Sequence, residues 1–118
     1  MTLQHVTLET RRADIEAELA FWALLGFDEV QPPPGLRGVA TWVARDGTQI
    51  HLLYDDDPVV MPRGHVAVVA SDYEAAVGRL GDAGFAVRPT EEHWGAPRAF
   101  VHTPAGHVVE VMAAPPPP

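Results

Sequence analysis

The sequence predicts an α+β domain made of two tandem modules, each with the element order β-α-β-β-β. Two observations carry this prediction. The same landmarks recur at a spacing of 58 to 60 residues, and each half contains strand-like alternation, one helical segment and three further strand-like segments. The chain has 118 residues, of which 47% are hydrophobic, and this suits one domain with a packed core.

The repeat is visible in four landmarks that keep the same order in both halves. Each half opens with a strand-like stretch that contains a histidine, His5 in LQHVTL and His65 in RGHVAV. A helical segment then ends in Gly-Phe, and each half closes with a glycine turn and an apolar strand. The further matched pairs are Gly26 with Gly84, Gly47 with Gly106, and His51 with Glu110. We infer that the two modules arose by duplication.

The first half is predicted to contain a strand, a helix and three more strands. The opening strand alternates, so that Leu3, His5 and Thr7 share one face. The helix has apolar residues at helical spacing and ends at Gly26; its expected buried side chains are Ile15, Leu19, Trp22 and Ala23. The expected ranges are residues 3–8 for the first strand, 13–25 for the helix, and 27–31, 38–45 and 49–54 for the later strands.

The second half is predicted to repeat this order. Its opening strand places His65, Ala67 and Val69 on one face. The helix is expected over residues 71–83, with Ser71 as N-cap and Glu74 three residues later. Its expected buried side chains are Tyr73, Val77 and Leu80. The later strands are expected at residues 85–89, 98–102 and 107–112.

We expect the modules to form a single domain. Module one covers residues 1–54, an acidic linker with two prolines covers 55–63, and module two covers 64–112. Residues 113–118 end in four prolines, which cannot join a helix or a central strand, so a frayed tail is expected. A module of about 55 residues buries too little surface to be stable alone, so the modules must pack on each other or on a second chain.

The composition narrows the classes of partner. Sixteen acidic and eight basic residues give a formal charge of −8, which disfavours nucleic acid and anionic membranes as partners. No apolar run is long enough to cross a bilayer and no signal-peptide pattern opens the chain, so a cytoplasmic location is expected. The sequence has six histidines and no cysteine, so a metal would be held by nitrogen and oxygen.

Four polar residues occupy equivalent positions in the repeat. His5 and His51 lie on the first and last strands of module one, and His65 and Glu110 on those of module two. Superposing the modules superposes the two pairs, and these donors suit divalent zinc, nickel, cobalt, iron or manganese. A carboxylate within an apolar strand also needs a partner or a metal. We therefore expect these four residues to bind a metal, although hydrogen-bonded core histidines, or a His–Glu cluster without metal, stay open.

These residues resemble the vicinal oxygen chelate superfamily, which includes glyoxalases, bleomycin-resistance proteins and extradiol dioxygenases. The stretch HWGAPRAFVHTPAGHVVEV, residues 93–111, is similar to the signature of its second module, and the resemblance covers residues 3–112. It implies that His5, His65 and Glu110 are metal ligands. The fourth ligand position, usually Glu or Gln in glyoxalase-like members, is His51 here. Without His51, the other three form a two-histidine, one-carboxylate set of the kind found in non-haem iron enzymes.

The resemblance implies a metal-dependent, glyoxalase-like enzyme of the isomerase, lyase or epimerase type that chelates a small oxygenated metabolite. Glu110 or His51 is then the base. The alternative is a metal-free, bleomycin-resistance-like protein that sequesters an antibiotic or another aromatic molecule. Superfamily members of this length are commonly dimers with swapped modules, so a homodimer is expected.

Several further side chains are candidates for contact with a small-molecule ligand, with ordinary packing as the competing explanation. Arg98 is the candidate for an anionic group of that ligand. The other histidines, His93, His102 and His107, are expected to face solvent or to support the site. The candidate ligand-binding residues are Thr7, Trp42, Leu53, Trp94, Arg98, Phe100 and Met112.

Overall fold

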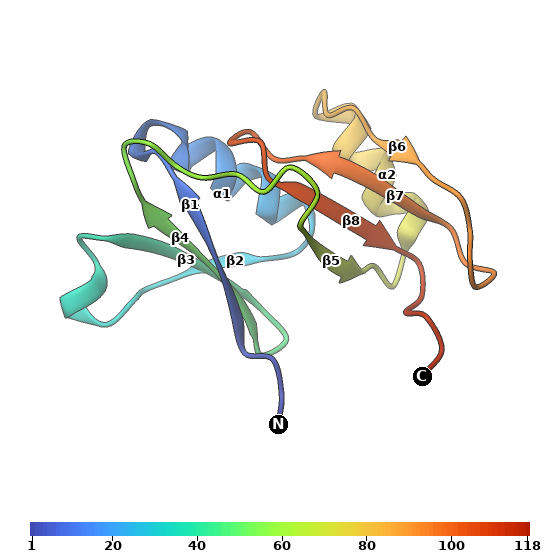
Figure 1. Ribbon diagram of the computed structural model, residues 1–118, viewed down its shortest axis with the longest axis horizontal. Coiled ribbons are helices and arrows are strands. Elements are labelled where there is room, and N and C mark those ends of the chain that lie inside the picture. The colour runs from blue at the N-terminus through green and yellow to red at the C-terminus, as the bar shows by residue number, and fades with distance from the viewer. The chain divides into compact units, whose positions relative to one another are not determined.

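The structure is a computed structural model that describes residues 1–118. It divides into two compact units, Met1–Val60 and Met61–Pro118. Each unit contains one α-helix and four strands in the order β-α-β-β-β (Figure 1). The predicted α+β class and the two repeated modules are therefore confirmed.

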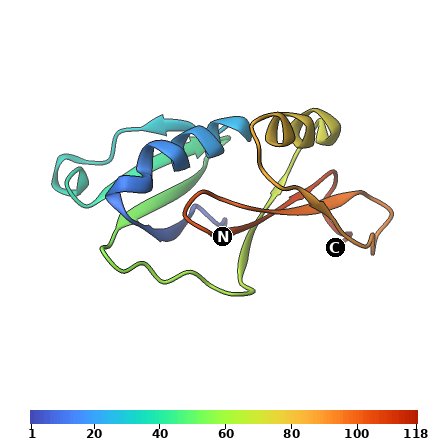
Figure 2. The ribbon, with the colours of Figure 1, turned by 90° about the horizontal axis from the view of Figure 1, so that it is seen from above.

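Unit 1 contains a four-stranded sheet with the strand order β1-β4-β3-β2. β1 pairs with β4 in parallel, and the other two pairs are antiparallel. The helix α1 packs against β2 and β3 (Figure 2). A parallel pair needs a long connection, which α1 and the two intervening strands supply. The elements are β1 (His5–Thr10), α1 (Ile15–Leu24), β2 (Asp28–Val30), β3 (Ala40–Arg45) and β4 (Thr48–Tyr54).

Unit 2 repeats this topology with the strand order β5-β8-β7-β6. β5 pairs with β8 in parallel, and the helix α2 packs against β8. The register also repeats, because Thr7 stands opposite His51 in unit 1 and Ala67 stands opposite Glu110 in unit 2. The elements are β5 (His65–Val69), α2 (Tyr73–Asp82), β6 (Arg88–Pro89), β7 (Arg98–His102) and β8 (Val108–Met112).

Both helices end as predicted, at a glycine with positive φ. Gly26 has φ 84° and Gly84 has φ 92°, a region that side chains other than glycine rarely adopt. In each case the next residue folds back, because the Phe27 N–H donates to Trp22 O and the Phe85 N–H donates to Leu80 O. These two N–H groups are thus used by the helix ends and cannot begin a strand.

This helix ending explains the strand that was predicted least accurately. A strand was expected at residues 85–89, and only Arg88–Pro89 pairs with β7. The Phe85 N–H is still bonded to Leu80 O of α2, so it cannot pair with β7, and the proline at 89 has no N–H to donate. The strand expected at 27–31 is shortened for the same reason and begins at Asp28.

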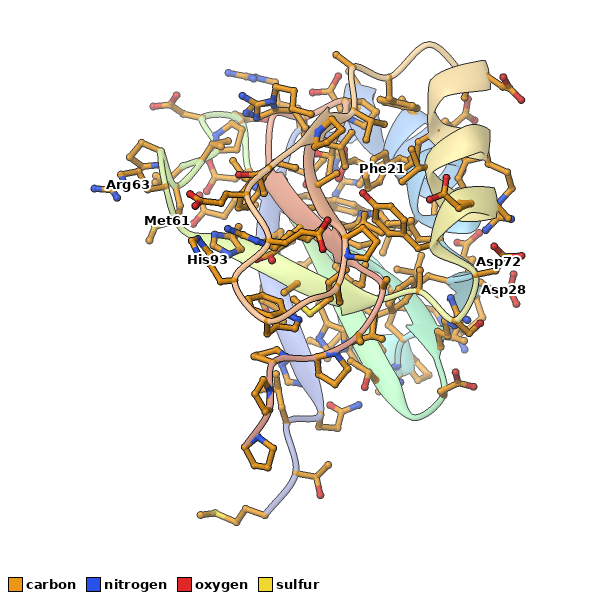
Figure 3. All side chains as sticks on the ribbon, turned by 90° about the vertical axis from the view of Figure 1, so that its right-hand side faces the viewer. Phe21, Asp28, Met61, Arg63, Asp72 and His93 are labelled. Atoms are coloured by element: carbon orange, nitrogen blue, oxygen red, sulfur yellow. The ribbon has the colours of Figure 1, made fainter.

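The helix starts and the buried face of α1 also differ from the prediction. The N-cap of α2 is Asp72 rather than Ser71, because the Asp72 carboxylate accepts a hydrogen bond from the Ala75 N–H (Asp72 is labelled in Figure 3). The fully buried residues of α1 are Glu18, Phe21 and Trp22, while Ala23 is exposed and Ile15 and Leu19 are half-buried. Glu18 accepts a hydrogen bond from the Trp22 indole at 3.4 Å, so it can be buried despite its charge.

The C-terminal tail is partly held in place rather than frayed from its first residue. The Ala113 N–H donates to Pro97 O, and Ala114 O accepts the indole N–H of Trp94 at 2.9 Å. Only the four closing prolines are fully exposed. Neither helix of the protein is long and apolar enough to cross a membrane.

We predict that Gly26→Ala destabilises the protein by about 1–2 kcal/mol, because a side chain there is strained by positive φ. An added Cβ would also lie 2.8 Å from Nη1 of Arg45, which donates to the Leu25 carbonyl at the end of α1. The matched control is Gly78→Ala within α2, where an added Cβ meets nothing within 4 Å. It should stabilise the protein by about 0.5–1 kcal/mol. Urea unfolding midpoints measure both, and equal effects of the two substitutions would contradict the explanation.

Candidate metal and ligand site

Three aromatic rings lie face to face across the sheet of unit 1. Trp42 on β3 stands opposite His51 on β4, with ring centroids 3.8 Å apart and planes 2° from parallel. His5 on β1 stacks on His51 with a centroid distance of 4.0 Å and an angle of 16°. Since β4 lies between β1 and β3, His51 is the middle ring of this stack.

The two imidazoles of the stack use different nitrogens for their hydrogen bonds. His5 Nδ1 lies 2.7 Å from Gln4 Oε1, and His51 Nε2 lies 2.7 Å from Gln49 Oε1. An amide oxygen has no proton to donate, so each of these ring nitrogens carries the hydrogen. In the neutral rings, the free lone pair is therefore on Nε2 of His5 and on Nδ1 of His51.

His51 is also the more protected of the two imidazoles. Its exposed fraction is 8%, whereas His5 is exposed. Burial of the ring, and secondarily the charge of the neighbouring His5, lower the pKa of His51 below its ordinary value. Both effects favour a neutral His51 with an unprotonated nitrogen.

A small apolar cavity adjoins this stack. Its volume is about 120 Å³, and its lining includes the candidate residues Thr7, Trp42, His51 and Leu53. The sequence analysis did not name the other three lining residues as site residues, although Leu36 belongs to the proline-rich loop between β2 and β3. Through Leu36, this loop borders the cavity. Those three residues are Leu36, Val39 and Ala40.

In unit 2 the equivalent pair is in direct contact. His65 Nε2 lies 3.1 Å from Glu110 Oε1, and His65 Nδ1 lies 3.1 Å from the carbonyl oxygen of Arg63. The carbonyl accepts, so Nδ1 carries a hydrogen. The carboxylate oxygen is also an acceptor, so a hydrogen on one ring nitrogen and a cation bound at the other would satisfy both contacts. The ring of Phe100 meets His65 edge-on at 5.2 Å.

Arg98 holds the second oxygen of the same carboxylate. Its Nη1–H donates to Glu110 Oε2 at 3.2 Å, and its Nε–H donates to Glu91 O at 2.9 Å. The guanidinium carbon lies 5.5 Å from the centroid of the Trp94 ring and 5.7 Å from that of Phe100. Glu110 is 5% exposed, so its charge is balanced within the protein rather than by water.

The structure thus brings the predicted site residues together within each unit. Met112 is buried and stands opposite Arg98 on the neighbouring strand. His93, which is labelled in Figure 3, and His102 are both exposed. His107 is 5% exposed and therefore does not face solvent. Its backbone N–H donates to Thr103 Oγ1 in the turn before β8.

The donor geometry tests whether a divalent metal fits these residues. Donor atoms 3.1 Å apart, as in His65 and Glu110, subtend about 95° at an ion about 2.1 Å from each, close to the right angle of octahedral coordination. The free Nε2 of His5 is an equally suitable donor. His5 and His51 cannot share an ion in these rotamers, because a metal lies in the plane of its imidazole and the two planes are nearly parallel. Within either unit no three such donors come together.

The comparisons with known proteins agree with this fold. Residues 5–112 match the family model of the glyoxalase-like domain, so the chain belongs to the glyoxalase-like domain family. The family fits the vicinal oxygen chelate superfamily, and the resemblance seen in the sequence is confirmed. No curated protein matches the sequence.

Solved structures share the fold at low sequence identity. A Bacillus anthracis protein assigned to the glyoxalase family is 20% identical, with a TM-score of 0.85 and coverage of 95% of this chain and 93% of the other. A glyoxalase/dioxygenase from Nostoc punctiforme is 21% identical, with a TM-score of 0.77 and coverage of 97% and 91%. A lactoylglutathione lyase from Agrobacterium tumefaciens is 18% identical, with a TM-score of 0.72 and coverage of 94% and 92%.

We predict that Arg98 and Glu110 are energetically coupled. Arg98→Met and Glu110→Gln each leave a largely buried group without its partner, so each should cost about 1–3 kcal/mol of stability, and the double variant should cost less than their sum. A double-mutant cycle from urea unfolding measures this coupling. The matched control is the Arg45–Asp46 pair, at 3.4 Å but with side chains 36% and 89% exposed, which should show no measurable coupling. Additive effects at Arg98 and Glu110 would contradict the prediction.

Proposed function

We propose that this protein is a divalent-metal-dependent enzyme that acts on a small oxygenated metabolite, with His5, His65 and Glu110 as the metal ligands. One observation carries the choice of ligands. Nδ1 of His5 and Nδ1 of His65 each face an oxygen, which leaves Nε2 as the nitrogen to bind a metal, the usual orientation of metal-binding histidines, and Nε2 of His65 lies 3.1 Å from Glu110 Oε1, the third proposed donor. His51 has the opposite arrangement, because its Nε2–H is held by Gln49.

The bound metal would act as a Lewis acid that stabilises negative charge on oxygens of the substrate. The protein's own residues would hold the proposed ligands in position. Arg98 fixes the second oxygen of Glu110, so that Oε1 is presented to the metal from a single orientation. Gln4 and Arg63 fix the tautomers of the two ligand histidines.

We propose His51 as the group that accepts a proton from the substrate. It lines the cavity of unit 1, and its lowered pKa keeps it unprotonated. Glu110 is less suited to this role because both of its oxygens already have cationic or hydrogen-bonding partners. Proton transfer of this kind belongs to isomerase and lyase reactions, and one of the structural relatives is a lactoylglutathione lyase.

We propose that the cavity beside the stack holds an apolar part of the substrate. Thr7, Trp42 and Leu53 would contact it, as the sequence suggested, together with Leu36 and Val39. Its volume of about 120 Å³ is slightly smaller than that of apolar cavities of about 150 Å³ that hold benzene. A short branched chain or a small ring is therefore the largest group we expect there. In unit 2 the corresponding contacts would come from Trp94, Phe100 and Met112.

We also propose that the protein works as a homodimer. Unit 1 supplies one proposed ligand, His5, and unit 2 supplies His65 and Glu110, so a complete centre needs a unit 1 and a unit 2, from one chain or from two. If the two units come from different chains, dilution to monomers abolishes metal binding. A metal-loaded monomer in light scattering would show that one chain is sufficient.

We predict that protein purified without chelators contains close to one divalent metal ion per chain. Elemental analysis should show that His5→Ala, His65→Ala and Glu110→Ala remove the metal, since each deletes a ligand. His51→Gln should retain it. The matched control is His102→Ala, which changes an exposed histidine on β7 and should also retain the metal. Loss of metal in His51→Gln would instead support the four-ligand set that the repeat suggested.

Absence of metal, even after reconstitution with zinc, nickel, cobalt, iron or manganese, would contradict this function. It would favour a metal-free protein that sequesters an aromatic or other apolar molecule. The observation that favours this second candidate is the apolar cavity beside Trp42. Ligand screens by tryptophan fluorescence would then be the appropriate test, because Trp42 lines that cavity.

A further inference from the structure

We propose that Arg98 binds a carboxylate of the substrate, and that the substrate is a small 2-oxo or 2-hydroxy acid. This inference rests on the proposed metal-dependent function and names the chemical class on which it acts. It is carried by three observations within unit 2: the place of Arg98 in the repeat, the hydrogen-bond donors that it has left over, and the charge around Glu110.

The place of Arg98 in the repeat directs it to the ligand-binding face. On β7, Phe100 stands opposite Glu110 and Arg98 lies two residues before it, on the same face. The residue of unit 1 at the same spacing is Ala40, which lies two residues before Trp42 and lines the apolar cavity. Ala40 and Arg98 thus occupy equivalent positions on the same face of the two units. The side chain there is a methyl group in unit 1 and ends in a guanidinium in unit 2.

Arg98 has more donors than its structural partners use. A guanidinium has five N–H groups, of which Nε–H is taken by Glu91 O and one Nη1–H by Glu110. The remaining three have no hydrogen-bond partner in the protein. The only fully buried side-chain polar atom without a partner is Thr10 Oγ1, so the Nη2 group of Arg98 is not among the fully buried ones. An arginine that served only to neutralise Glu110 would not need to keep these N–H groups without a partner.

The guanidinium is also already held in one orientation. Its side chain is only 13% exposed, and the Glu91 carbonyl, the Glu110 carboxylate and the Trp94 and Phe100 rings surround it. A group that is fixed before binding loses little conformational entropy when a ligand arrives. The planar fork of a guanidinium matches the planar oxygens of a carboxylate.

The charge balance favours an anion at this place. Arg98 and Glu110 cancel each other, so a divalent metal bound through Glu110 and neutral imidazoles leaves the site positive, within a chain of formal charge −8. A carboxylate whose neighbouring carbon carries a second oxygen can satisfy Arg98 and offer two adjacent oxygens for chelation. These requirements together define a 2-oxo or 2-hydroxy acid.

The experiment uses the full chain loaded with cobalt(II), whose visible absorption reports ligand binding. Two probes of equal carbon number are titrated: 2-oxobutanoate, which has a carboxylate, and butane-2,3-dione, which has adjacent oxygens but no charge. Wild type should bind 2-oxobutanoate at least about ten-fold more tightly than the dione, as expected for charge-assisted hydrogen bonds. Arg98→Met should weaken 2-oxobutanoate by about ten-fold or more and leave the dione nearly unchanged.

Two further variants separate charge from structure. Arg98→Lys keeps the charge but not the fork, so it should retain part of the preference for 2-oxobutanoate. The matched control is Arg11→Met, which removes one exposed arginine from unit 1 and should alter neither titration. The cobalt content and thermal unfolding of every variant show whether the site is still assembled.

Several results would overturn the inference. Equal binding of the two probes by wild type would do so, as would an Arg98→Met variant that weakens both probes equally, because Arg98 would then act only through Glu110. Tighter binding of inorganic phosphate than of 2-oxobutanoate would also overturn it, because Arg98 would then bind a phosphate rather than a carboxylate.

Failure of wild type to take up cobalt would contradict the proposed function rather than the role of Arg98. In that case the same two probes are tested on the metal-free protein by the fluorescence of Trp94, whose ring adjoins the guanidinium. A fluorescence change with 2-oxobutanoate, lost in both Arg98→Met and Trp94→Phe, would support the carboxylate site. Absence of that change in wild type would overturn it.

Discussion

The structure of each unit depends on one interaction, the parallel pairing of its first strand with its last. This pairing sets Thr7 opposite His51 and Ala67 opposite Glu110, and so places His5 beside His51 and His65 beside Glu110 on one face. A shift of one residue would turn every one of these side chains to the other face of its strand. The candidate site therefore follows from strand register, and the glycines that end α1 and α2 help to fix where the following strands begin.

Much of this was accessible from the sequence because the deciding signals are local. Gly26 and Gly84 terminate helices through their own backbone conformation, and the apolar alternation of the long strands identifies their faces. The errors arose where the hydrogen bonds of individual side chains, rather than the backbone pattern, decided the outcome. Buried Glu18 accepts a hydrogen bond from Trp22, four residues later on the same helix, and Asp72 is the N-cap instead of Ser71 because its carboxylate accepts from the Ala75 N–H.

The candidate site shows the same limit. The two donor pairs could be predicted, since the repeat alone makes them equivalent. The sequence left His51 either as a metal ligand or as a base, and the contacts that favour the second proposal depend on which nitrogen Gln49 engages and on the ring of Trp42, which lies on another strand. Leu36 and Val39 could not be singled out as lining residues either, because their place in the lining depends on the folded path of the segment between β2 and β3.

The two units share one backbone plan, and their side chains make them chemically different. Unit 1 presents a stack of three rings beside an apolar cavity, whereas unit 2 presents a buried carboxylate between a histidine and an arginine. A carboxylate in place of His51 would add a negative charge without a compensating cation. With His51 instead, Glu110 is the single carboxylate among the paired positions and Arg98 already balances it. If a divalent ion binds as proposed, its charge would be left for the substrate to neutralise, and the pairing of Arg98 with Glu110 would then influence which substrates bind.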